Sequence, residues 1–155
     1  MASEVTRIQD QLQRAFVGGA WHGPSVLELL ADVDADKAAA RPIAGAHNIW
    51  ELTLHIAAWE GAALRRLSGD RAELPDEEDW PPVTDTSAAA WQQTIAILKD
   101  NNQQLQEAIA DLAETRFDEP VVDGMSSVYL TLHGAVQHDL YHAGQIAILK
   151  KAHVR

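Results

Sequence analysis

The segment QHDLYHAGQI at residues 137–146 carries two histidines, His138 and His142, four positions apart in a stretch typical of helix. Residues at i and i+4 lie on one face of an α-helix, with Cβ atoms about 6 Å apart. Two imidazoles placed in this way can bind one metal ion if another part of the chain supplies a further ligand. His55, in the helix-like segment LTLHIAAWE at residues 52–60, is such a ligand. These three histidines are the first candidates for a functional site.

Apolar residues recur every three to four positions around both histidine segments, which is the period of an amphipathic helix. We expect one helix over residues 127–152, whose inward positions are Ala135, His138, His142, Ile146 and Leu149. We expect another over residues 48–68, in which His55 lies on or beside the apolar face. Asn48 and Glu51 predict a capping box at its start.

The remainder of the chain supplies two more long helices, expected over residues 4–17 and 87–114, and a short helix that begins after Ser25. Residues 70–86 carry seven acids and three prolines, so we expect an exposed connection long enough to cross one end of a bundle. No segment indicates a β-strand. The fold class is therefore all-α, a single four-helix bundle over residues 1–155. The first long connection leaves room for a crossover, so a simple up-down order is not assured.

Composition and charge exclude several classes of protein. A net charge of −11 disfavours binding to nucleic acid. The absence of cysteine excludes disulfides, thiolate zinc sites and a protein thiol nucleophile, and the cytoplasm is the simplest compartment. The N-terminal residues lack an apolar signal core, and no apolar run approaches the roughly 20 residues that span a bilayer. We therefore expect neither nucleic acid nor membrane as a partner.

The histidine pair has three competing interpretations. It can be a buried pair that only hydrogen-bonds to polar neighbours. It can be a metal site completed by His55, because burying three imidazoles without partners is costly. Three neutral ligands would leave positions open to water or substrate, as in catalytic sites. It can also resemble the HExxH motif of metalloproteases, but Asp139 is a methylene shorter than glutamate and would miss the general-base position. A ferritin-like dimetal site is excluded, because no glutamate precedes a histidine by three residues.

Other residues are candidates for the surroundings of a metal. His47 precedes the helix that holds His55 and is expected at the mouth of the site, although it can equally be a surface or cap residue. Tyr141 is a candidate proton donor, and its alternative is a packed tyrosine with a satisfied hydroxyl. A pocket lined by His47, Trp50 and Tyr141 would favour an enzyme, whereas a sealed site would favour a binding protein. Arg65 and Arg66 either solvate a helix end or, if one of them is partly buried, that arginine holds a substrate carboxylate.

Two blocks of sequence together resemble the DinB/YfiT-like family of small bacterial metal-binding helical bundles. One block is GAHNIWELTLHIAAWE at residues 45–60, and the other is residues 137–146. The order and helix spacing match over nearly the whole chain. The resemblance implies a bundle with crossover topology and a divalent metal held by His55, His138 and His142. We expect zinc or nickel, with iron and manganese as further options.

The resemblance also implies a function. Characterised relatives include S-transferases and an isomerase that use low-molecular-weight thiols such as bacillithiol or mycothiol. We therefore expect a metal-dependent enzyme, a thiol-dependent S-transferase or a related activity on small electrophiles, with the thiol supplied by a cosubstrate. The alternatives are a metal-dependent hydrolase and a metal-binding homodimer that senses or sequesters without catalysis.

A homodimer is expected for two reasons. Members of the family are commonly homodimers. In addition, five tryptophans are hard to bury fully in one small bundle, and exposed apolar patches usually mark interfaces.

Overall fold

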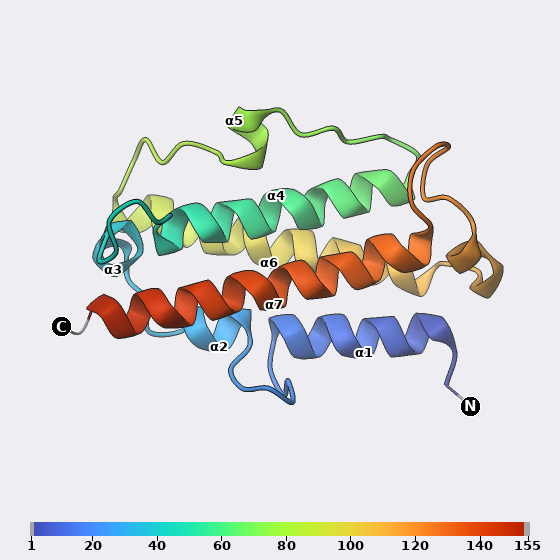
Figure 1. The fold of residues 1–155 in the computed structure, drawn as a ribbon, viewed down its shortest axis with the longest axis horizontal. Coiled ribbons are helices and arrows are strands. Elements are labelled where there is room, and N and C mark those ends of the chain that lie inside the picture. Colours follow the sequence, from blue (N-terminus) through green and yellow to red (C-terminus); the bar gives the residue numbers. More distant parts are fainter. Residues whose placement is uncertain (1, 154–155) are drawn as a thin grey trace.

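The computed structural model describes residues 2–153, and its regular structure over that range is entirely helical (Figure 1). The elements are α1 (Glu4–Phe16), α2 (Val26–Leu30), α3 (Ala35–Ala39), α4 (Ile49–Leu67), α5 (Asp76–Asp79), α6 (Ala88–Ala110), the 3-10 helix η1 (Glu114–Asp118) and α7 (Val128–His153). The predicted all-α class is confirmed. Within residues 2–153, no helix combines the length and the apolar character that a membrane crossing requires.

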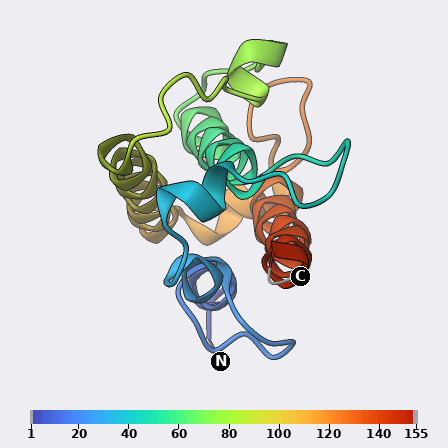
Figure 2. The same cartoon turned by 90° about the vertical axis from the view of Figure 1, so that its left-hand side faces the viewer.

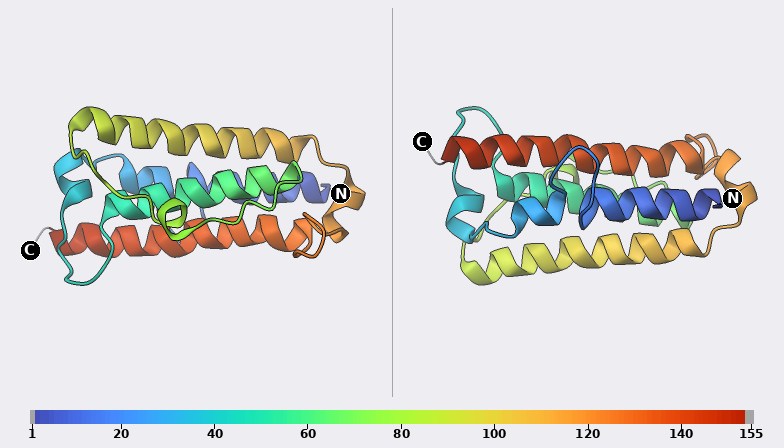
Figure 3. Two further views of the ribbon diagram at one scale, coloured as in Figure 1. Left: turned by 90° about the horizontal axis from the view of Figure 1, so that it is seen from above. Right: turned by 90° about the horizontal axis from the view of Figure 1, so that it is seen from below.

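The four long helices α1, α4, α6 and α7 form a bundle with a crossover. Helices α1 and α4 each lie against both α6 and α7, as the view along the bundle in Figure 2 shows. Helices α4 and α6 run in the same direction, because the connection over residues 68–87 returns along the outside of α4 before α6 begins (Figures 1 and 3). The crossover therefore lies in the second long connection, not in the first, where the sequence left room for it.

The ends of the helices follow from capping. The side chain of Asn48 accepts a hydrogen bond from the backbone N–H of Glu51, whose own side chain returns to Asn48, so the predicted capping box is present. Helix α6 ends at Ala110, earlier than the predicted residue 114. Glu114 begins the separate 3-10 helix η1, and its carboxylate accepts hydrogen bonds from the backbone N–H groups of Glu4 and Val5 in the first turn of α1.

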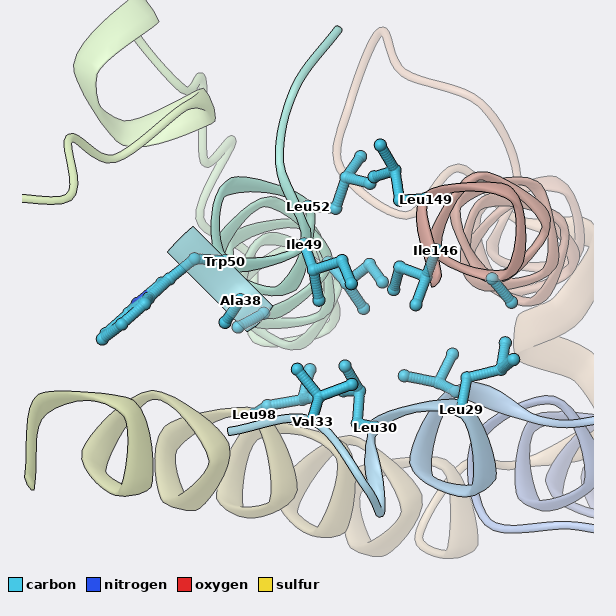
Figure 4. Packing of buried hydrophobic residues seen from close by; sticks show 14 of the residues in the cluster. Leu29, Leu30, Val33, Ala38, Ile49, Trp50, Leu52, Leu98, Ile146 and Leu149 are labelled. Atoms are coloured by element: carbon cyan, nitrogen blue, oxygen red, sulfur yellow. The ribbon is translucent and has the colours of Figure 1, made fainter. Parts of the chain in front are cut away.

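The hydrophobic core consists of two clusters along the bundle. One includes Trp50, Ile56, Leu98 and Ile146, part of which Figure 4 shows. The other includes Ile8, Leu12, Leu105, Ile109 and Leu132. Between the clusters along the three helices lie the buried polar residues Glu60 on α4, Asn102 on α6 and Asp139 on α7. The inward face of α7 thus includes Val136 and Asp139, which were not among the predicted inward positions, whereas Ala135, which was, is only half-buried.

The tryptophans are better packed than their number suggested. Trp50 and Trp91 are buried, Trp59 and Trp80 are partly buried, and Trp21 is fully exposed. The argument for a homodimer from the number of indoles therefore reduces to Trp21. The homodimer itself stays a prediction.

Candidate metal centre

Helices α4 and α7 bring the three predicted histidines together. Nε2 of His138 lies 3.1 Å from Nε2 of His55 and 3.1 Å from Nε2 of His142. One ligand atom from each ring lies within 4.8 Å of the others, as a shared metal ion requires. His55 and His142 are buried and His138 is half-buried. The spacing of four residues on α7 therefore does place two imidazoles beside the third.

The hydrogen bonds on the outer side of the rings fix which nitrogens carry protons. Nδ1 of His55 lies 2.7 Å from the carbonyl oxygen of Asp79, and Nδ1 of His142 lies 2.6 Å from Oε1 of Gln145. Both oxygens can only accept, so both Nδ1 atoms must donate. In the neutral rings Nε2 of His55 and of His142 is then a bare lone pair. At least two unprotonated nitrogens face the same point, which is the donor set that a metal ion takes.

Burial keeps the rings of His138 and His142 neutral. It is the main cause that lowers the pKa of His138 to about 3, and the neighbouring His142 and His55 lower it further. Burial also lowers the pKa of His142, against a smaller opposing effect of its hydrogen bond to Gln145. Neutral imidazole is the form that binds metals, so protons compete weakly for the site at neutral pH.

The crossover connection closes one side of the histidine cluster. Oδ1 of Asp79 lies 3.1 Å from Nδ1 of His55 and accepts a hydrogen bond of 2.6 Å from the indole N–H of Trp59. The indole of Trp80 lies between two imidazoles, stacked 3.8 Å from His55 and 3.7 Å from His47. A ligand histidine commonly donates its second N–H to such a carboxylate or carbonyl, which orients the ring.

A family comparison agrees with this geometry. A model described as the DinB superfamily matches residues 20–146, which contain all three histidines and most of the bundle. The chain belongs to the DinB superfamily. No curated protein and no solved structure matches it. What this DinB protein does must therefore be argued from its own residues.

The histidine cluster of the DinB chain opens on one side into a cavity of about 290 Å³. His138 and Trp59 line it together with Arg66, Leu130 and Ala135. Of the residues expected around the metal, Trp50 is placed elsewhere: it is buried in the core, and its indole N–H donates to Thr94 on α6 (Figure 4). The tryptophans that border the histidines are Trp59 and Trp80.

The two candidate catalytic residues lie at the rim of the site. The ring of Tyr141 is 67 % exposed and meets the ring of His142 edge-on, with 5.1 Å between centroids. His47 is exposed, covers the outer face of Trp80, and has Nδ1 3.2 Å from a carboxylate oxygen of Glu51. Both positions are next to the histidine cluster, and neither residue is among those that line the cavity at His138.

Asp139 does not belong to the histidine cluster. It is fully buried and faces Glu60, whose Oε1 accepts a hydrogen bond of 2.6 Å from Asn102. Burial raises the pKa of Asp139 to about 8, and burial together with the charge of Asp139 raises the pKa of Glu60. A carboxyl enclosed in this way cannot act as general base on a substrate, which removes the metalloprotease interpretation.

Asp79 is expected to contribute to metal affinity. An Asp79→Asn substitution keeps an acceptor for Trp59 but removes the negative charge beside His55, so the affinity for Zn²⁺ should fall about 10-fold. Competition with a chromophoric chelator measures this. Glu77→Gln is the matched control, because Glu77 is an exposed acid on the same short helix. Equal affinity of Asp79→Asn and the unmodified protein would contradict the role assigned to Asp79.

Proposed function

We propose that this DinB protein is a divalent-metal enzyme that transfers a low-molecular-weight thiol to a small electrophile. His55, His138 and His142 would hold the ion, with zinc or nickel as the expected metals. A divalent ion at these nitrogens would lower the pKa of a thiol bound beside it and so would supply a thiolate at neutral pH. The observation that carries the proposal is the convergence of three Nε2 atoms, at least two of them unprotonated, next to an open cavity.

The open side of the site favours catalysis over storage of the ion. Structural metal sites are closed by four protein ligands, whereas catalytic sites have three and keep a position for water or substrate. Three histidines meet here, and within residues 2–153 no further histidine or acid joins the cluster. The cavity beside His138 provides room for a substrate to approach.

The absence of cysteine decides where the sulfur comes from. The chain has no thiol of its own, so the nucleophile of an S-transfer must be a cosubstrate. In the reaction the thiol would give its proton to solvent and its sulfur would form a bond to the electrophilic carbon. The bond between that carbon and the leaving group would break, and the leaving group would depart with the bonding pair and take up a proton. Tyr141, beside His142 at the rim, is the proposed proton donor to that leaving group.

Cobalt substitution tests the proposal. Protein loaded with Co²⁺ should develop an intense near-ultraviolet charge-transfer band when 2-mercaptoethanol is added. The band should grow with pH through an apparent pKa below the value of about 8.5 for an unperturbed thiol. Tyr141→Phe should leave the band unchanged and slow turnover.

His133→Ala is the control for this experiment, because His133 is on α7 but contacts Glu4 and not the cluster. It should retain the full band. If fully cobalt-loaded protein shows no band with any small thiol, thiol transfer is wrong, and metal-dependent hydrolysis or metal binding without catalysis becomes the better account.

A further inference from the structure

The cavity beside His138 is a groove between α4 and α7 with two different ends. Trp59 and Arg66 are seven residues apart on α4, which corresponds to about 10 Å along the helix axis. Because α7 runs in the opposite direction, its residues recede from His138 toward Leu130 along the same line. The histidine cluster thus lies at one end of the groove and the base of the Arg66 side chain at the other.

Arg66 differs from the other arginines in having no carboxylate partner. Six other arginines lie within residues 2–153, and each has a carboxylate oxygen within 4.0 Å: Arg7, Arg14, Arg41, Arg65, Arg71 and Arg116. Over the same residues Arg66 has no carboxylate oxygen within 4.0 Å, and the charge of Glu73 acts on it from beyond that distance. Acids outnumber bases in the sequence by 23 to 12. A half-buried guanidinium that makes no direct ion pair in so acidic a protein indicates a binding site for an anion.

The side chain of Arg66 is nevertheless held in place. Nε donates to the carbonyl oxygen of Arg71 at 3.1 Å, and Nη2 donates to that of Ala72 at 3.2 Å. Cζ lies 5.3 Å from the centroid of the Trp59 ring, in a cation–π contact. Nη1 has no hydrogen bond to any residue of the described chain, so it is available to a ligand in the groove.

Trp59 connects the guanidinium to the histidine cluster. Its ring centroid lies 5.9 Å from that of His138, so one indole contacts both ends of the groove. Ala63, Leu130 and Ala135 make most of the remaining wall apolar. The hydroxyls of Ser126 and Thr131, 3.2 Å apart, are further polar groups in the same wall. The groove therefore suits a short apolar molecule with a negative charge at one end.

We propose that this groove binds a small organic acid, whose carboxylate pairs with Arg66 while its hydrocarbon part packs on Trp59 and its far end reaches the histidine cluster. A carboxylate fits better than a phosphate, because one arginine and mostly apolar walls match a single charge of small size. The identity of the far end as the reacting group rests on the proposed function. The pairing with Arg66 does not.

Binding of 3-phenylpropionate and of its neutral amide, followed by isothermal titration calorimetry, tests the proposal. The acid should bind at least 10-fold more tightly than the amide. Arg66→Gln should reduce this preference to within 2-fold, and Arg66→Lys should keep part of it, because a lysine retains the charge but not the fork of N–H groups. Arg65→Gln is the matched control, since Arg65 is the exposed neighbour that pairs with Asp70, and it should keep the full preference.

Measurements with and without Co²⁺ separate this proposal from the proposed function. A preference for the acid that depends on Arg66 in both forms supports the groove, even if no thiol charge-transfer band is found. A preference that survives in Arg66→Gln and vanishes on removal of the metal would mean that the carboxylate binds the ion, which overturns the proposal. Inorganic phosphate that displaces the acid at equal concentration would overturn the assignment to carboxylates.

Discussion

Each of the substitutions His55→Ala, His138→Ala and His142→Ala is expected to abolish stoichiometric Zn²⁺ binding under conditions that saturate the unmodified protein. The three Nε2 atoms lie within reach of one ion, and removal of any one leaves two protein ligands. The loss of affinity should therefore exceed the roughly 10- to 100-fold decrease that is typical when a residue that only orients a ligand is replaced. Metal analysis after gel filtration, followed by competition with a chelator, measures it.

His133→Ala again serves as the control, because it removes an imidazole from the same helix without touching the cluster. It should bind metal at full stoichiometry. Full occupancy in His142→Ala would contradict the assignment most directly, since Nε2 of His142 is one of the two nitrogens that must be unprotonated. The far-ultraviolet circular dichroism of each variant shows whether the bundle is retained.

The histidine cluster could be predicted because its cause is local. A spacing of four residues on a helix fixes the relative position of His138 and His142 before any packing is known. The third histidine of the cluster followed from an apolar face elsewhere, since His55 is adjacent to Ile56 in a capped helix. The class of fold followed from the apolar period of the long helices in the same way.

The positions of Asp79 and Trp80, in the crossover connection, could not be predicted from the sequence. Asp79 and Trp80 lie in a connection without helical period, and only the course of that connection along α4 brings them to His55. Trp80 was the one available signal that this acidic, proline-rich connection packs on the bundle, because a large apolar indole is usually packed against another part of the protein.

The inward position of Asp139 was not predicted, for a different reason. Leu132, Val136, Asp139, Ala143 and Ile146 follow a spacing of four, three, four and three, which is the pattern of an inward face. Asp139 had been considered only as a general base in the HExxH-like interpretation, whereas its spacing indicates an inward position. Glu60, on the opposite helix, is a second charged residue at such a position. A charged residue at an apolar position is better interpreted as a member of a buried polar group.

Glu60→Gln is expected to stabilise the protein by about 2 kcal/mol at pH 8 and by much less at pH 5. In the described chain, Oε2 of Glu60 and both side-chain oxygens of Asp139 have no hydrogen-bond donor, so a proton on one of the two carboxyls is needed to join them. Glutamine supplies that donor permanently. Its Oε1 can still accept from Asn102, and its Nε2 can donate to Asp139.

The direction of the pH dependence follows from the raised pKa values. Both carboxyls bind a proton more tightly in the folded than in the unfolded protein, where their pKa values are near 3.8 and 4.5. Their contribution to stability is therefore fully present below those values and is lost as the pH rises toward about 8, the raised pKa of Asp139. Glu60→Gln removes one of these titrating groups and offers a hydrogen bond to the charged form of the other.

Urea denaturation of metal-free protein at pH 5, 6.5 and 8 measures the effect as a difference between variant and unmodified chain. The difference is the right quantity because the lowered pKa values of His138 and His142 act in the opposite direction: they add stability as the pH rises to about 6.5, equally in both proteins. Glu107→Gln, an exposed glutamate on α6, should show no such difference at any of the three values. If the difference in free energy of unfolding between Glu60→Gln and the unmodified protein is constant with pH, Glu60 and Asp139 do not share a proton. The hydrogen bond from Asn102 would then be the one that stabilises these buried carboxyls.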